Sequence, residues 1–414
     1  MMHTRPAACE PQRLSPALYP VRVSTVPAEP LRPLRALRND RAILTAAQRL
    51  AADEGWTGLL FPRIAADTGL SIRPLHERYS GRDALAADLW TERLALDIVD
   101  LLGRAASTPT GRVDMEALLA ACTAPTQTQR AASELLMVVP YSPAVAASVA
   151  TSLGAHLATW LTPRGNSPSR ALAAQRAYLI ALALGLVILA RRYPQRMPAL
   201  TGFAGTIADA LASGGKPQRV PAERADHLDA PVVFGTDDPI GERLLTATLD
   251  AVAEVGYDLA SVDQISRRAG FTKGALFRRY STKRDLFLDA TRRMSASTME
   301  ANLAFEHRIE STTTPGIASA VAIREFMRPG RERARAVFLE QTRLAIHDPQ
   351  VRAVIDAEIS DVLAAESGAQ DGDGLIHIHL SQALALGIVQ LQVLHPSAWE
   401  LPFDVITVPL LDHQ

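Results

Sequence analysis

A segment of this chain occurs twice, about half the chain length apart, and this repeat limits the folds that the sequence can adopt. The later copy, Ser261–Leu286, reads SVDQISRRAGFTKGALFRRYSTKRDL and has the pattern of a helix-turn-helix (HTH) with a basic second helix. The earlier copy lies 201 positions before it, and no gap is needed to align the two. The aligned pairs are Gly55 and Gly256, Ile64 and Ile265, Gly69 and Gly270, Leu75 and Leu276, Tyr79 and Tyr280, and Leu85 and Leu286.

The repeat extends beyond the HTH. The sequence ALALG at 181–185 recurs at 383–387, and Pro194 matches Pro396 at the same offset of 202. Chance matching of short Ala/Leu words is the alternative, which the shared offset disfavours. A period this long does not fit a solenoid and predicts a tandem pair of whole domains. We therefore expect a disordered proline-rich tail at 1–38, a first HTH at 39–86, a first helical body at 87–213, a linker at 214–238, a second HTH at 239–288 and a second body at 289–414.

Composition favours helices throughout. Aromatic residues make up 5% of the chain, whereas alanine, leucine and arginine are abundant. We expect an all-α fold. In the first half the predicted helices are 39–54, 61–68, 72–79, 82–102, 112–122, 130–139, 143–162, 168–192 and 203–212. In the second half they are 239–255, 261–269, a short helix after Thr272, a longer one from Ser281, and 333–346, 349–366 and 374–394.

The second HTH resembles the TetR family of bacterial transcriptional regulators. The signature is AGFTKGALFRRYSTK at 269–283, with a turn glycine, a capping threonine, an anchoring leucine, two aromatic residues and a lysine in register. The resemblance covers about 48 residues strongly in the second copy and about as many weakly in the first. It implies an N-terminal three-helix DNA reader on a variable helical body that forms a ligand pocket and a dimer interface.

Charge separates the two copies. Residues 267–284 contain seven basic side chains and no acidic one, whereas the aligned window 66–83 contains three of each. A net charge of -1 for the chain does not exclude DNA, because binding needs only a local basic face. We therefore expect the second HTH to dominate operator binding, with its recognition helix entering the major groove. The residues expected at DNA are Ser261, Arg268, Thr272, Lys273, Gly274, Phe277, Arg278, Tyr280 and Lys283.

Lys273 suits guanine O6 or N7, and Gly274 permits close approach of the backbone. The resemblance places Lys283 at the family's phosphate-binding lysine, and it places Phe277 where a tyrosine often contacts phosphate. Core packing is the stronger interpretation for Tyr280, as it is for Leu276 and Ile265.

The first HTH departs from the pattern where bases would be read. Ile72 stands where the second copy has Lys273, and Leu60 stands where it has Ser261. Pro74 falls in the first turn of its helix, where proline is tolerated. Whether this copy touches DNA stays open; the candidates are Arg73, His76, Arg78 and Arg82.

The two copies suggest an intramolecular pseudo-dimer, packed through 168–192 and 374–394; a homodimer is the alternative. The bodies should enclose a pocket for a small apolar effector. Its candidate residues are Leu135, Met137, Tyr141, Trp160, Phe326, Phe338 and His347, each of which also fits an ordinary core.

Other classes of protein fit less well. No phosphate loop, HExxH or GxSxG motif is present, so we expect no enzyme, no cofactor and no metal site. The apolar run 177–190 is too short to span a bilayer, and the two cysteines, Cys9 and Cys122, fit a reducing cytoplasm. We predict a cytoplasmic, nucleoid-associated, ligand-responsive repressor that binds double-stranded operator DNA. A helical sensor or protein-interaction scaffold that no longer binds DNA is the alternative.

Overall fold

A computed structural model of the chain describes residues 34–107, 115–163, 167–213, 234–366 and 372–412, together with residues 218, 220–222, 225, 226 and 232. Within these residues every regular element is a helix and no strand is present. The prediction of an all-helical fold is therefore confirmed.

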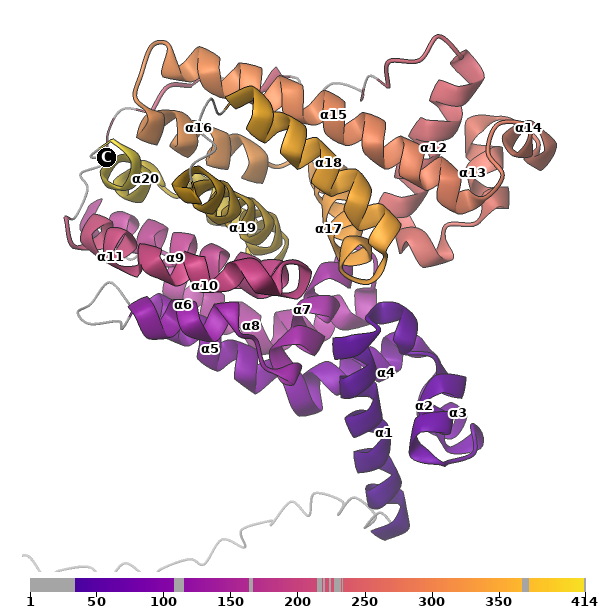
Figure 1. The fold of residues 1–414 in the computed structure, drawn as a ribbon. Helices are drawn as coiled ribbons and strands as arrows, with labels where there is room; N and C mark the ends of the chain where they lie inside the picture. Colours follow the sequence, from indigo (N-terminus) through magenta and orange to yellow (C-terminus); the bar gives the residue numbers. More distant parts are fainter. Residues whose placement is uncertain are drawn as a thin grey trace, which may run out of the picture.

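The N-terminal half begins with the three helices of the first HTH and continues into a layered body (Figure 1). Its α-helices are α1 (Leu34–Asp53), α2 (Phe61–Thr68), α3 (Arg73–Arg78), α4 (Arg82–Leu89), α5 (Ala95–Ser107), α6 (Met115–Thr123), α7 (Gln127–Val138), α8 (Pro143–Leu161), α9 (Ser167–Arg192), α10 (Met197–Leu200) and α11 (Ala204–Ala212). A π-helical turn, Trp90–Leu94, joins α4 to α5, so the two form one interrupted rod where a single helix was predicted.

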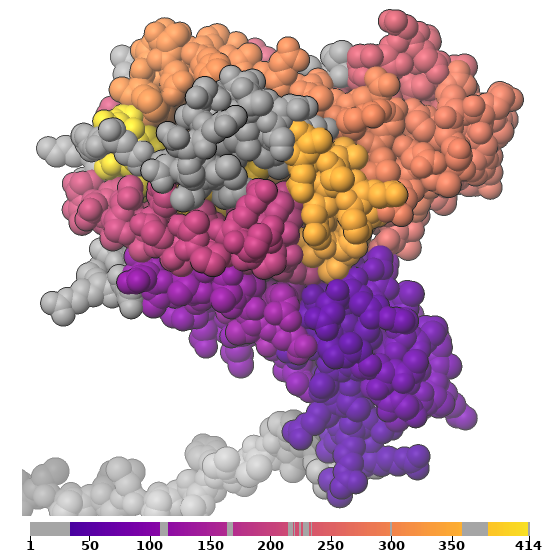
Figure 2. Space-filling model, viewed as in Figure 1, coloured from indigo at the N-terminus to yellow at the C-terminus, as the bar shows by residue number. Residues whose placement is uncertain are grey.

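The C-terminal half is also built from helices. Its α-helices are α12 (Pro239–Leu259), α13 (Val262–Ala269), α14 (Lys273–Phe277), α15 (Lys283–Glu310), α16 (Pro315–Met327), α17 (Glu332–His347), α18 (Pro349–Glu366), α19 (Gly372–Leu394) and α20 (Asp404–Leu411). The first HTH (α1–α3) and the second HTH (α12–α14) project on the same side of the molecule, away from the C terminus (Figures 1 and 2).

Several predicted boundaries need correction. Helix α1 begins at Leu34, so the predicted disordered tail is wrong for residues 34–38; its remainder, 1–33, lies outside the described residues. The segment LRALR consists of strong helix formers, which explains the earlier start. The predicted stop at Gly256 holds for the long part of α12, since this glycine is non-helical with φ of 75°, and a short helical turn up to Leu259 follows it. Helices α16 and α20 were not predicted, and they pack against each other.

The described part of the predicted linker 214–238 is anchored on the second body. Ala225 is buried, its N–H donates to Glu325 Oε2 at 3.1 Å, and its carbonyl accepts from Arg331 at 3.0 Å. Phe234 is buried against the core of the second HTH. This connection is therefore held in place at these residues.

Helices α9 and α19 lie against each other between the two halves (Figure 1). Their closest approach is at two glycines. A Cβ atom on Gly185 would lie 1.6 Å from the carbonyl oxygen of Ala383, and one on Gly387 would lie 1.6 Å from that of Ala181. The contact is reciprocal, as in an interface with a two-fold axis. Backbone meets backbone here because neither glycine has a side chain.

We expect Gly185→Ala to destabilise the protein by about 3 kcal/mol or more, because the added methyl group meets a rigid backbone carbonyl. Urea unfolding followed by circular dichroism measures the loss. Gly154→Ala in α8 is the matched control, since a Cβ atom added there would have no neighbouring atom within 4 Å. That change should be neutral or stabilise by up to about 1 kcal/mol. Equal unfolding midpoints for the two variants would contradict the close contact.

Among the described residues, two helices are long and apolar enough to cross a membrane by length and composition alone, Pro143–Leu161 and Ser169–Arg192. The apolar window of the second is 89% buried inside the protein, as expected of a core helix. The prediction that residues 177–190 form a buried helix is confirmed, since all of them are buried.

Candidate nucleic-acid interface

The second HTH is framed by side-chain caps at each helix start. Ser261 Oγ accepts from the N–H of Gln264 at 3.1 Å, and Thr272 Oγ1 accepts from the N–H of Ala275 at 3.3 Å. Gly270 ends α13 in the left-handed conformation, with φ of 75°. The predicted caps at Ser261 and Thr272 are thus confirmed. Each hydroxyl already accepts a hydrogen bond from a backbone N–H, and this bond caps the N-terminal end of its helix.

The interior of the second HTH is formed by the residues that the sequence assigned to packing. Ile265 and Leu276 are fully buried. Tyr280 is partly buried, and its hydroxyl donates to Asp289 Oδ2 at 2.9 Å, which with burial raises the pKa of the phenol. The Tyr280 hydroxyl is therefore already engaged within the domain, and its predicted contact with DNA would require it to leave Asp289.

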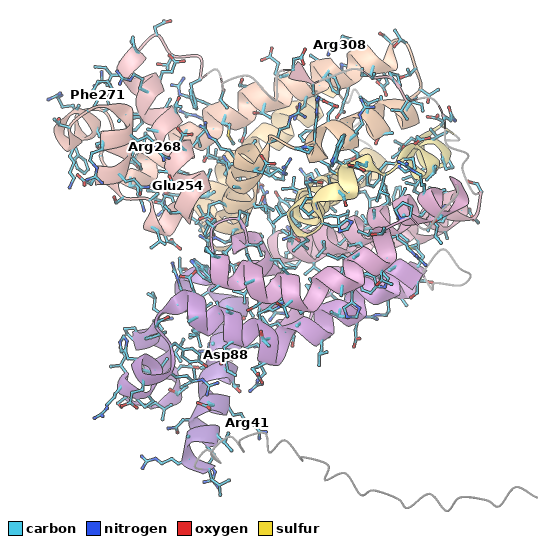
Figure 3. The ribbon with its side chains drawn as sticks, turned by 180° about the vertical axis from the view of Figure 1, so that it is seen from behind. Arg41, Asp88, Glu254, Arg268, Phe271 and Arg308 are labelled. Atoms are coloured by element: carbon cyan, nitrogen blue, oxygen red, sulfur yellow. The ribbon has the colours of Figure 1, made fainter. Side chains whose placement is uncertain are left out.

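The opposite face of α14 is open to solvent. Thr272, Lys273, Gly274 and Arg278 are exposed, and Phe277 keeps 51% of its surface accessible. Helix α14 is the outermost element of this half (Figure 1), and Figure 3 places Phe271 at the same outer end. An exposed phenylalanine beside cations on a protruding helix fits a surface that meets the groove of a duplex.

Carboxylates from outside the basic window pair with several of its cations. Asp238 accepts two hydrogen bonds from Arg279, at 2.5 and 3.1 Å, and these lower its pKa to about 2. Asp263 lies 3.3 Å from Lys273 Nζ and also pairs with Arg267. Further pairs join Arg268 to Glu254 and Arg284 to Asp348. The seven basic residues counted in 267–284 therefore overstate the net positive charge of this surface, because the acidic partners lie outside that range. Exposed pairs of this kind are weak and can exchange for phosphate.

Comparison with known proteins identifies this domain. Residues 244–290 match the family described as bacterial regulatory proteins, tetR family. The chain carries a TetR-type DNA-binding domain. An uncharacterized HTH-type transcriptional regulator of Mycobacterium bovis is 31% identical over 121 residues, and two counterparts from Mycobacterium tuberculosis strains match equally. The match covers 29% of this chain and 56% of the relative, so the chain spans about half the length of the curated relatives it matches. These matches support a DNA-binding transcriptional regulator.

In the TetR-type domain, Lys283 is turned toward the protein. Its ammonium donates to the carbonyl of Tyr257 at 2.8 Å and lies 4.2 Å from the centre of that ring, and burial lowers its pKa. Arg82, at the aligned position of the first half, lies 4.3 Å over the ring of Trp56 and pairs with Asp258 at 3.7 Å. A phosphate contact by either cation requires it to leave these partners.

The recognition helix of the first HTH, α3, presents little free positive charge. Arg73 pairs with Glu77 at 2.6 Å, and Arg78 is held by Asp40 and Asp88. The exposed His76 ring packs edge-on against Phe61, with 5.0 Å between the ring centres. Of the four candidate DNA residues in this copy, Arg73 and His76 face solvent, whereas Arg78 and Arg82 are tied into the fold.

Sequence reasoning missed a group of charged residues at the centre of the molecule, here called the central ion cluster: Glu134, Arg191, Glu340, Arg343 and His347. Glu134 in α7 accepts from Arg343 at 3.2 Å, from Arg191 at 3.0 Å and from the backbone N–H of Trp56 at 2.8 Å. It also lies 3.2 Å from His347 Nε2. This carboxylate thus joins the first body, the second body and the base of the first HTH.

Glu340 in α17 makes the corresponding contacts for the second HTH. It accepts from the N–H of Tyr257 at 2.7 Å, from the hydroxyl of Tyr141 at 2.6 Å and from Arg343 at 2.7 and 2.8 Å. Each HTH is therefore tied at its base to a buried carboxylate. Arg343 contacts both carboxylates, so it connects the contact at the first HTH with the contact at the second.

The carboxylates of the central ion cluster are buried, and the neighbouring cations keep them ionised. Burial alone would raise the pKa of Glu134, but Arg191, His347 and Arg343 outweigh it and hold the pKa well below its usual range. Burial opposes ionisation of Glu340 as well, and there Arg343 together with Tyr141 keeps the pKa low. The one sequence signal for this cluster is Glu134, a single acidic residue within the apolar stretch AASELLMVV. Its partner Arg343 lies 209 positions away, so the sequence does not show how the charge is balanced.

The predicted effector residues do not gather around one described cavity. Leu135 and Met137 are fully buried in the core, while Tyr141 and His347 contact the carboxylates of the central ion cluster. Phe338 packs on the core, Phe326 is partly buried, and Trp160 lines a small cavity of about 280 Å³. A larger cleft of about 690 Å³ lies between the second HTH, α17 and the end of α19; its lining includes Asp250, Arg268, Arg335 and Gln392. An apolar pocket formed by the predicted residues stays a prediction.

Proposed function

We propose that this protein is a transcriptional regulator that reads operator DNA in the major groove, mainly through the second HTH. The observation that carries the proposal is the exposed face of α14, with Thr272, Lys273 and Arg278 at the outer end of a TetR-type domain. The N-terminal end of a recognition helix meets base edges, so Lys273 suits a guanine and Arg278 a flanking phosphate.

We further propose that the chain is a pseudo-dimer of two duplicated units, paired through α9 and α19. The reciprocal contacts of Gly185 and Gly387 support this arrangement, as does the placement of both HTHs on one side of the molecule (Figure 1). One chain would then grip two half-sites of a single duplex. A small effector that alters the angle between the HTHs would release the DNA, and the protein would act as a repressor.

The test is a footprint on genomic fragments that the purified protein enriches, including its own upstream region. We expect protection of two half-sites about one helical turn apart at low salt. A folded protein that protects no fragment would contradict the proposal.

A scaffold that no longer binds DNA is the second candidate, favoured by the carboxylates that neutralise both HTHs. A scaffold would keep its cellular activity when Lys273 and Arg278 are both replaced with alanine, whereas a regulator would lose it. Lys283 is left unchanged in this test because it packs on Tyr257 and its removal would disturb the fold.

A further inference from the structure

We propose that the two HTHs demand different bases at corresponding places of one operator. The first HTH accepts thymine methyl groups through Ile72 and Leu60, while the second reads guanine through Lys273. This inference rests on the proposed function, because it assumes that the protein binds a duplex.

The corresponding positions can be identified because the two HTHs share their geometry. Gly69 and Gly270 make the same left-handed turn, with φ of 68° and 75°. Leu75 and Leu276 anchor the two recognition helices, and both are fully buried. Counting from these fixed points, Ile72 immediately before α3 corresponds to Lys273 at the start of α14. Leu60 before α2 corresponds in the same way to Ser261 before α13.

Both replacements expose a large apolar side chain at the surface that would meet a groove. Ile72 is 39% exposed and Leu60 is 49% exposed, while the neighbouring Leu59 is buried completely. Each lies at the N-terminal end of an HTH helix, and its apolar surface stays in contact with water unless a partner covers it. In the major groove the one apolar group on a base edge is the C5 methyl of thymine. Contact with that methyl removes apolar surface of both molecules from water.

The first HTH has another source of attraction to the DNA backbone. Helix α1 extends past α2 and α3 (Figure 1), and its first turns carry Arg35, Arg38 and Arg41, all of which are exposed. Figure 3 places Arg41 on the outer part of α1, on the same side of the molecule as Arg268 of the second HTH. In the second half the aligned helix starts at Pro239, opposite Arg38, and Glu242 stands opposite Arg41, so the second HTH lacks these arginines. Arginines beside a recognition helix whose own arginines are paired with carboxylates can neutralise phosphates that flank a thymine-rich half-site.

The test replaces thymine with deoxyuridine, which removes only the methyl group, in one half-site at a time of an operator selected with the full-length protein. We expect uracil in the half-site of the first HTH to weaken binding about fourfold for each methyl group that Ile72 or Leu60 covers. The variant Ile72→Ala should bind the thymine operator with a similar loss and should no longer respond to uracil at the position that Ile72 covers, while it keeps the response at the position that Leu60 covers. Its response to changes in the other half-site should stay that of the parent protein.

A second variant should gain a new base preference instead of losing affinity. Ile72→Lys copies the second HTH, and we expect it to shift the preferred base in the first half-site from thymine toward guanine. Because Ile72 is partly exposed, both variants should fold, which circular dichroism checks.

The possible outcomes separate the inference from the proposed function. Normal operator binding with no uracil effect in either half-site, or with protection of a single half-site, overturns the inference and leaves the regulator intact. Absence of DNA binding by the folded parent protein overturns both.

Discussion

Replacing Lys273 and Arg278 together with alanine should lower the affinity for operator DNA about 100-fold at moderate salt. Each side chain is exposed on or beside α14, and contacts of this type contribute about 1–3 kcal/mol each. The loss should shrink as salt rises, since part of it comes from phosphate neutralisation. Fluorescence anisotropy with a labelled operator at several salt concentrations measures both the affinity and its salt dependence.

A matched control removes the same charge elsewhere. Arg292 and Arg308 are exposed on α15, and their joint replacement with alanine changes the net charge equally. We expect that control to change the affinity less than threefold, because only long-range screened attraction is lost. Similar losses in the two double variants would mean that α14 is not the recognition helix.

Replacing Arg343 with methionine should lower the free energy of unfolding by about 3–5 kcal/mol, the second large effect we expect. Arg343 contacts Glu134 and Glu340, and its removal leaves both carboxylates buried without their shared cation. Urea unfolding monitored by circular dichroism measures the change. Arg333→Met is the control: its ion pair with Asp250 is half exposed, so we expect a loss below about 1 kcal/mol. Equal losses would show that the central ion cluster adds no more than a surface pair.

The central ion cluster should make the free energy of unfolding fall as the pH is lowered. The pKa values of Glu134 and Glu340 are lowered in the folded protein. Their contribution to stability is therefore present above the ordinary glutamate pKa, and it is lost as the pH falls through the lowered values. In Arg343→Met this loss should begin at a higher pH than in the parent protein.

Local patterns allowed the second HTH to be predicted from sequence. The caps at Ser261 and Thr272, the turn at Gly270 and the anchor Leu276 all depend on residues within a few positions of one another. Helix α16 was missed for a physical reason: it is buried on nearly every side, so its sequence lacks the alternation between polar and apolar faces that marks a surface helix.

Contacts between distant segments were beyond local patterns. Nothing near Glu134 indicates that Arg343, 209 positions later, would neutralise it. The pairing of Arg279 with Asp238 joins residues 41 positions apart, which is why the basic window looked more strongly charged than the folded surface is. A charge count along a sequence therefore overestimates the positive charge of a binding face when the fold places acidic residues from other segments on that face.

If the chain is the proposed pseudo-dimer, the pairing of α9 with α19 joins two halves of one polypeptide, and this has consequences for DNA occupancy and for evolution. Association within one molecule does not weaken on dilution, whereas separate subunits come apart below their dissociation constant. Occupancy of an operator should then rise with the first power of protein concentration, even at a few molecules per cell. Each half also meets the same fixed companion in every molecule. A change such as lysine to isoleucine at one recognition helix is therefore never copied to the other, and the two halves are free to specialise.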